Sequence, residues 1–167
     1  MKQNISLWQF SGFAVTALLG ALLHYLYDWS GKSIIIAPFS GIDESTWEHM
    51  KLLYFPLLTF ALFQSFFFKG YGNFWCIKLR GVLTGLLAIP VIFYTYNGAL
   101  GKSPDWINIV IFFVAAALPF ITEAYFLKKG KSDCKHPHLA FAAICLIGVM
   151  FVFFTFYKPN IPIFKDN

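Results

Sequence analysis

The sequence predicts an all-α integral membrane protein: a bundle of five transmembrane helices that forms one domain over residues 1–167. Apolar residues make up 58% of the chain and charged residues only 13%, whereas roughly 25% of the residues of a soluble domain are charged. The charges are also clustered, so that five long stretches contain no Asp, Glu, Lys or Arg. Tryptophans mark the ends of the apolar stretches, where an indole ring sits well among lipid headgroups. They are Trp8, Trp29, Trp47, Trp75 and Trp106.

The five expected helices follow from the charge-free stretches and their flanks. They cover about residues 7–27, 50–68, 80–98, 105–127 and 138–157, and each approaches the roughly 20 helical residues that cross a bilayer. The first is too long for the apolar region of a signal peptide and lacks a small-residue cleavage site. A soluble protein of this size is excluded, because five buried helices would leave no polar surface to cover them.

Small residues predict close helix packing in two of the spans. Thr16, Gly20 and His24 follow one another at four-residue intervals, so they share one stripe of the first span. Gly81 and Gly85 form a GxxxG pattern in the third span, which favours close approach of helices within the chain. The three cysteines, Cys76, Cys134 and Cys145, are odd in number and lie in or beside spans. We therefore expect free thiols that pack as small apolar residues, and no disulfide framework or zinc ribbon.

The basic residues predict the orientation. Eight Lys and Arg residues flank the spans on the side of the N-terminus and five on the other side. The positive-inside rule then places the N-terminus in the cytoplasm and the C-terminus outside. Because the basic residues lie at helix ends, the net charge of +5 indicates orientation in a lipid bilayer and no binding of nucleic acid.

Residues 42–51 contain the densest polar motif and lead directly into the second span. Ser45 and Glu48 have the spacing of a capping box, in which each side chain bonds the backbone N–H of the other residue. Capping leaves Glu44 and His49 without an explanation. His24, near the end of the first span, lies at the same membrane level as His49, so the two helices bring these polar groups to one place.

A polar pocket facing outward is therefore predicted. The residues expected to line it and bind a ligand are His24, Glu44, Glu48, His49, Tyr94 and Asn97. His24, Glu48 and His49 could hold a divalent metal such as zinc, with one coordination position left open. The same groups could relay a proton, bind a solute or ion, or form a hydrogen-bonded network with a purely structural role.

Two further features have alternative interpretations. Residues 34–39 are apolar but too short to span, so they could form a lid over the pocket or an anchor in the membrane surface. Glu123 lies inside the fourth span near Lys128 and Lys129, where it could be a paired interfacial carboxylate or part of a proton relay.

No nucleophile motif, phosphate-binding loop or dinucleotide fingerprint is present, so no catalytic residue and no definite cofactor are assigned.

The motif from Asp43 to Leu52, followed by Phe55-Pro56 and preceded by a histidine near the end of the first span, resembles a family of small multi-pass bacterial membrane proteins of unknown function. That family is expected to carry Asn at the position of Asp43, so its motif reads (N/D)ESTWEH. The resemblance implies a helical bundle in a bacterial cytoplasmic membrane, and it implies no activity.

Three functions are compatible with these patterns. The leading hypothesis is a pocket that binds or moves a small solute, cation or proton. The alternative is a membrane-embedded metal-dependent hydrolase or transferase that acts on a lipid-linked substrate, and the third is a structural or regulatory membrane subunit. The patterns specify no oligomeric state.

Overall fold

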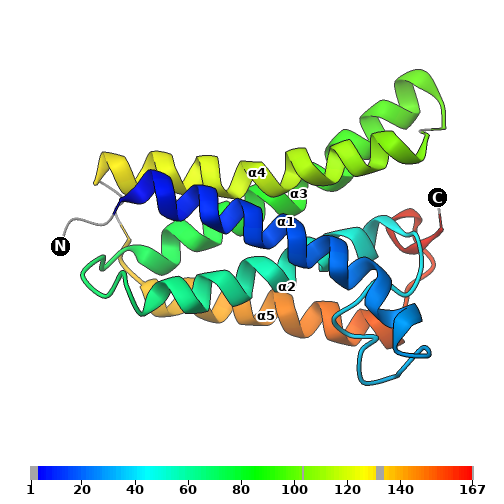
Figure 1. Ribbon diagram of the computed structural model, residues 1–167, viewed down its shortest axis with the longest axis horizontal. Coiled ribbons are helices and arrows are strands. Elements are labelled where there is room, and N and C mark those ends of the chain that lie inside the picture. Colours follow the sequence, from blue (N-terminus) through cyan, green and yellow to red (C-terminus); the bar gives the residue numbers. More distant parts are fainter. Residues whose placement is uncertain (1–3, 103, 131–133, 167) are drawn as a thin grey trace.

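The fold is a bundle of five long helices, seen in a computed structural model that describes residues 4–102, 104–130 and 134–166. The described residues contain no β-strand, and a short 3-10 helix follows the last long helix (Figure 1). The elements are α1 (Ile5–Trp29), α2 (Thr46–Ser65), α3 (Phe74–Leu100), α4 (Asp105–Lys129), α5 (Pro137–Phe156) and η1 (Pro162–Phe164). Each predicted span corresponds to one helix, and α3 differs most because it begins six residues earlier than expected.

The two ends of the bundle carry different segments. The start of α1 lies at one end together with segment 66–73, the end of α4 and the start of α5 (Figure 1); we call this the lysine end. The opposite end holds the C-terminus, segment 30–45 and the turn between α3 and α4; we call it the histidine end. An odd number of helices that all run the length of the bundle places the termini at opposite ends.

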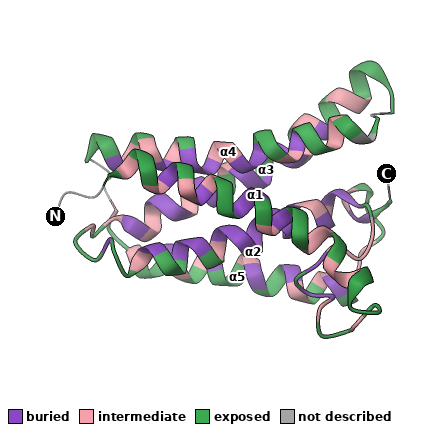
Figure 2. Cartoon of the chain, in the orientation of Figure 1, coloured by how far each residue is buried: buried purple, intermediate pink, exposed green. Residues whose placement is uncertain are grey.

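Four helices, α1, α3, α4 and α5, are long and apolar enough to cross a membrane. The remaining helix, α2, is more polar because it lies at the centre, in contact with α1, α3, α4 and α5. Figure 2 shows it as the most continuously buried helix. A helix covered by protein can keep polar groups that lipid would exclude. Its 20 residues still span about 30 Å, the thickness of the hydrocarbon layer.

The small residues of the predicted stripes lie at helix contacts. A Cβ atom on Gly20 of α1 would come within 3.0 Å of the carbonyl oxygen of Leu52 in α2 and 2.5 Å of the Phe112 ring in α4. A Cβ on Gly85 of α3 would meet Pro119 of α4 at 2.6 Å. The stripe on α1 therefore faces the bundle, and the GxxxG pattern packs within the chain, as predicted.

The five tryptophans divide into two groups. Trp29 and Trp106, at the histidine end, have exposed fractions of 67% and 63%, as expected of rings that meet lipid headgroups. The other three belong to aromatic clusters between helices. Trp8 contacts Phe60 and Phe68, Trp47 contacts Phe151 and Phe164, and Trp75 contacts Phe141.

A buried ion pair joins α3 to α4 near the lysine end. The Lys78 ammonium lies 2.5 Å from a Glu123 carboxylate oxygen, and the exposed fractions of the two residues are 2% and 1%. Three phenylalanine rings within 5.9 Å of the ammonium surround the pair, and such cation–π contacts strengthen where water is excluded. Glu123 is thus paired, as one interpretation expected, but with Lys78 across the helix interface instead of Lys128 or Lys129.

The prediction of three free thiols was wrong. Cys76 at the start of α3 forms a disulfide with Cys134 just before α5, and only Cys145 is a free cysteine within the described residues. The two Cα atoms are 6.1 Å apart, inside the range a disulfide can bridge. An odd number of cysteines does not exclude one bridge, because folding can bring together two that lie 58 residues apart.

We expect Glu123→Ala to lower the stability of the purified protein by roughly 3–5 kcal/mol, because it leaves the buried Lys78 ammonium without its counter-charge. Lys78→Met combined with Glu123→Leu should be less destabilising than Glu123→Ala alone, since no unpaired charge remains. Thermal unfolding in detergent measures both effects. Lys128→Ala, on the exposed surface of the same end, is the matched control. A Glu123→Ala protein as stable as this control would show that the pair contributes nothing.

Candidate metal-binding site

The two histidines singled out in the sequence lie side by side at the histidine end. The ring centroids of His24 on α1 and His49 on α2 are 5.8 Å apart. The Glu44 carboxylate lies between them, with one oxygen 3.6 Å from His24 Nε2 and the other 3.6 Å from His49 Nε2. The ligand atoms that the three residues offer are all within 4.8 Å of one another. Three chain segments therefore converge on one point.

A backbone hydrogen bond orients His49. Its Nδ1 lies 3.0 Å from the carbonyl oxygen of Ser45, one turn earlier. A carbonyl oxygen only accepts, so the hydrogen of the neutral ring is on Nδ1 and the lone pair is on Nε2. The lone pair points toward the Glu44 carboxylate. The same arrangement, with one ring nitrogen bonded to the backbone and the other free to bind, is typical of histidines that ligate metals.

Ser40 shapes α1 next to His24. Its hydroxyl accepts from the backbone N–H of Tyr27 at 2.9 Å and donates to the carbonyl oxygen of Leu23. The hydroxyl thus joins segment 30–45 to two backbone groups of α1 that lie one turn apart. Because His24 lies inside this turn, segment 30–45 and α1 are fixed relative to each other at the site.

The N-terminus of α2 positions Glu44. Ser45 caps the helix, accepting from the Glu48 backbone N–H at 3.4 Å, as the capping box predicts. In a capping box the Ser45 N–H would donate to the Glu48 side chain. Here it donates to Asp43 Oδ1 at 3.0 Å instead. The Glu44 backbone N–H donates to Asp166 at 3.2 Å, so the C-terminal segment holds this turn in place. Glu44 keeps a side chain with 64% exposure at the mouth of the site.

Glu48 lies apart from the histidine cluster, in a buried network of its own. One carboxylate oxygen is 2.6 Å from the Lys51 ammonium and accepts from the Ile42 backbone N–H at 3.1 Å. Lys51 also donates to the Ala37 carbonyl at 2.8 Å and to the Thr155 hydroxyl at 3.1 Å, so all three of its N–H donors have acceptors. Glu48 and Lys51 are both 0% exposed. Of the predicted metal ligands, the structure thus brings His24 and His49 together, with Glu44 beside them, and places Glu48 in this separate network.

The network extends to the C-terminal segment through Lys158. Its ammonium pairs with Asp43 and lies 3.5 Å from Glu48 Oε1. Burial alone would raise the pKa of Asp43, but Lys158 and hydrogen bonds from Ser45 outweigh it and leave the pKa below its ordinary value of 3.8. The ionised form of Asp43 therefore stabilises the folded state.

Tyr94 and Asn97 are placed near the site but outside the cluster. The Tyr94 hydroxyl lies 3.5 Å from Thr46 Oγ1 at the start of α2, and Asn97 is one turn further along α3. Neither is among the residues that line the cavity beside the histidines. Asn108 of α4, which the sequence analysis missed, does line it. The sequence signal that could have identified Asn108 is its position as a polar residue in the first turn of a long apolar helix.

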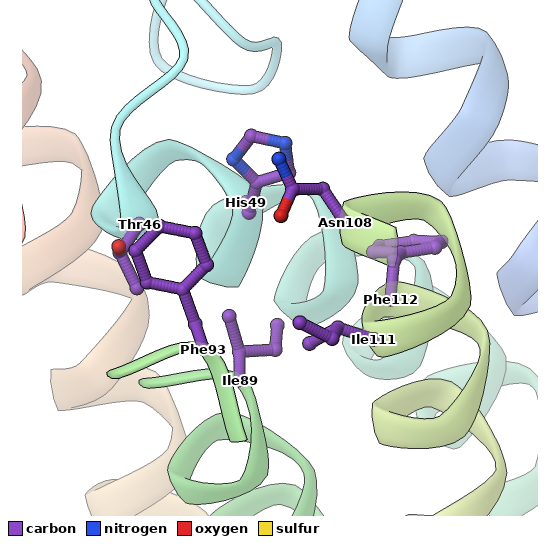
Figure 3. A pocket seen from close by; sticks show the side chains of 7 residues that line it. All are labelled: Thr46, His49, Ile89, Phe93, Asn108, Ile111 and Phe112. Carbon is purple, nitrogen blue, oxygen red and sulfur yellow. The ribbon is translucent and has the colours of Figure 1, made fainter. Parts of the chain in front are cut away.

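Below the histidines the interior of the bundle closes. A cavity of about 20 Å³, room for one water molecule, lies between α2, α3 and α4. Figure 3 shows the His49 ring and the Asn108 amide side by side at its upper edge, above Ile89, Phe93 and Ile111. The polar site is therefore separated from the rest of the bundle by packed apolar side chains.

Residues 34–39 form a series of turns beside the site. Ile34 and Ile35 are exposed by 73% and 76%, whereas Ala37 is buried and its carbonyl oxygen binds Lys51. The exposed isoleucines are suited to contact with the membrane surface, one of the two interpretations given for this segment. The Lys51 bond fixes the other half of the segment to α2.

We expect the stability of the protein to fall between pH 5 and pH 3 partly through Asp43. Its folded-state pKa is lowered, so its contribution is present above the unfolded pKa and is lost as the pH falls through the folded pKa. Asp43→Asn should therefore lower the melting temperature at pH 5 and reduce the further drop to pH 3. Asp28→Asn, an exposed residue at the same end, is the control. Equal pH dependence in the wild-type and Asp43→Asn proteins would contradict this role.

The chain belongs to a family of unknown function (DUF6512), whose profile matches residues 1–167. No curated protein matches the chain. No solved structure matches it either.

Proposed function

We propose that this membrane protein binds a divalent transition-metal ion at its histidine end, through His24 Nε2, one carboxylate oxygen of Glu44 and His49 Nε2. The observation that carries the proposal is the convergence of three ligand atoms within 4.8 Å of one another. They come from α1, the segment before α2, and α2 itself, so the folded bundle brings them together.

The spacing of these atoms suits ligands around an ion better than partners in a hydrogen bond. Each Nε2 is 3.6 Å from a Glu44 oxygen, beyond the usual hydrogen-bond range of about 2.7–3.2 Å. Ligands that bind tetrahedral zinc at about 2.1 Å lie roughly 3.4 Å from each other. The Nε2 lone pair of His49 and the Glu44 carboxylate also repel each other, and a shared cation removes that repulsion.

The ligand set indicates the class of metal. Two imidazole nitrogens and one carboxylate oxygen suit zinc and similar transition metals, whereas magnesium and calcium prefer oxygen ligands only. Three protein ligands leave a fourth position open toward the adjoining cavity, where a solute oxygen or a water molecule can bind. A metal with an open position can also lower the pKa of a bound water to about 7, the first requirement of hydrolysis.

The closed interior below the site favours binding over conduction. The side chains of Ile89, Phe93 and Ile111 line the water-sized cavity on the side away from His49 and Asn108. An ion at the histidines could exchange with its own side of the membrane, whereas these apolar side chains oppose its passage between α2, α3 and α4. We therefore propose a binding site accessible from one side.

We place the protein in a bacterial cytoplasmic membrane, with the lysine end in the cytoplasm and the metal site outside. The charge asymmetry supports this orientation. Lys51 and Lys78 are buried in ion pairs and can be left out of the count of basic residues. Each side of the membrane then loses one basic residue, so the excess on the cytoplasmic side is unchanged.

We expect the protein, purified through a tag without histidine, to contain about one zinc or similar ion per chain, as measured by elemental mass spectrometry. His24→Ala, Glu44→Gln and His49→Ala should each lower the metal content several-fold, because each removes a ligand. Glu48→Gln should retain the metal if it folds. The double variant His136→Ala, His138→Ala is the matched control, because it removes two exposed histidines at the other end.

Two results would contradict the metal site. One is a protein that binds no metal even after equilibration with zinc; a shift in the titration of the histidines in Glu44→Gln would then assign a shared proton to the cluster. The other is an equal loss of metal from the site variants and the His136/His138 control, which would show adventitious binding.

The disulfide offers a test of orientation. If the lysine end faces the cytoplasm, Cys76 and Cys134 meet a reducing environment in cells. In a Cys145→Ser background, rapidly quenched cells should then contain both cysteines as thiols, which react with a membrane-permeant maleimide and not with an impermeant one. A disulfide in quenched cells that becomes reactive after treatment with an impermeant reductant would show the opposite orientation.

A further inference from the structure

A cavity of about 540 Å³ adjoins the proposed metal site, within the size range of small-molecule pockets. It lies between α1, α2 and α4, and its lining is polar at one end and apolar at the other. The polar residues are His24, Tyr25, Glu44, His49 and Asn108. The other lining residues are Gly20, Ala21, Leu52, Ile109, Phe112 and Phe113. The cavity therefore has the polarity of an amphiphile.

The apolar part of the cavity opens sideways, toward lipid. Ala21 on α1 is exposed, and Ile109 and Phe113 on α4 have exposed fractions of 58% and 43%. Both helices are apolar enough to cross the membrane, so exposed side chains along them meet hydrocarbon. Figure 1 shows the reason for the opening: α1 and α4 lie together near the lysine end and diverge toward the histidine end.

The apolar part reaches about one helical turn or slightly more below the polar cluster. Gly20 lies about 6 Å below His24 along α1, and Phe113 lies about 7–8 Å beyond Asn108 along α4, at 1.5 Å per residue. That depth accommodates the first few carbons of a hydrocarbon chain. The remainder of a long chain would continue through the side opening into the bilayer.

Charge selects the headgroup. A divalent ion with Glu44 and two neutral histidines has a net charge of about +1 and one open position, which an anionic oxygen can fill. Glu44 is the only acid among the residues that line the cavity. The Tyr25 hydroxyl and the Asn108 amide add O–H and N–H donors to the cavity lining. A cationic headgroup would be repelled by the metal, and a soluble phosphate would leave the apolar half of the cavity filled with water.

We propose that this cavity binds one membrane amphiphile that has a phosphate headgroup at the metal and the start of its hydrocarbon chain between α1 and α4. The part of this proposal that concerns the headgroup rests on the metal site proposed above. The part that concerns the hydrocarbon chain rests on the cavity alone. The substrate or ligand class is thus a phosphate-bearing lipid.

The test uses the full-length protein in phosphatidylcholine nanodiscs that contain hexadecyl phosphate with a diazirine on the carbons nearest the phosphate. After illumination, peptide mass spectrometry should locate the label on residues of α1 and α4 that line the cavity. Unlabelled hexadecyl phosphate should compete roughly tenfold better than hexadecanol, hexadecyltrimethylammonium or inorganic phosphate.

Two variants of α1 separate the cavity from the general lipid surface. Ala21→Trp should reduce labelling roughly tenfold, because an indole at this exposed cavity residue fills the space and displaces no packed side chain. Leu22→Trp, on an exposed neighbour outside the cavity lining, should leave labelling unchanged. Both should keep the wild-type metal content, which also reports that the site is folded.

The outcomes distinguish the two proposals. Normal metal content with labelling spread evenly over the lipid-facing helices, or unaffected by Ala21→Trp, would overturn the amphiphile site and leave the metal site intact. Absence of metal with labelling still sensitive to Ala21→Trp and to hexadecyl phosphate would overturn the metal site alone and assign the headgroup to protonated histidines. Absence of both would overturn both.

Discussion

The buried pair of Glu48 and Lys51 is the interaction on which the histidine end depends. Both side chains are 0% exposed, and a buried charge without a partner costs several kcal/mol. Their hydrogen bonds reach the backbone of Ile42 and Ala37 and the hydroxyl of Thr155. Segment 30–45, the start of α2 and the end of α5 are thereby fixed to one another. Glu44 can meet the two histidines only because that segment has a defined conformation.

Two glutamates one turn apart thus have opposite environments. Glu48 is enclosed, with its Oε2 paired to Lys51 and its Oε1 3.5 Å from the Lys158 ammonium. Glu44 has 64% of its side chain exposed and faces two imidazoles. The lysine end is fixed in its own way, by the buried Lys78–Glu123 pair.

The sequence predicted what hydrophobic length and topology determine. Five helices, the inward stripe ending at His24 and the meeting of His24 with His49 all follow from the spacing of apolar runs and the membrane level of each end. The sequence did not show which of Glu44 and Glu48 lies beside the histidines, because that depends on the buried pairing of Glu48 with Lys51. In the sequence, these two residues have the three-residue spacing of an ordinary ion pair on a helix surface. Lys158 and the cysteine pair were missed because their partners are more than 50 residues away in the chain. Such pairings depend on tertiary distances that local patterns do not encode.

The proposed metal and the proposed amphiphile are coupled through charge. The Glu44 carboxylate by itself would repel a phosphate headgroup in a medium of low dielectric constant. A divalent ion reverses that sign and supplies the open position that a phosphate oxygen occupies. Metal binding would therefore determine which lipids enter the cavity between α1 and α4, since the apolar wall accepts any hydrocarbon chain. By linkage, a bound phosphate would raise the affinity of the site for the metal by the same factor. The two ligands together would hold segment 30–45 against the bundle more firmly than either one alone.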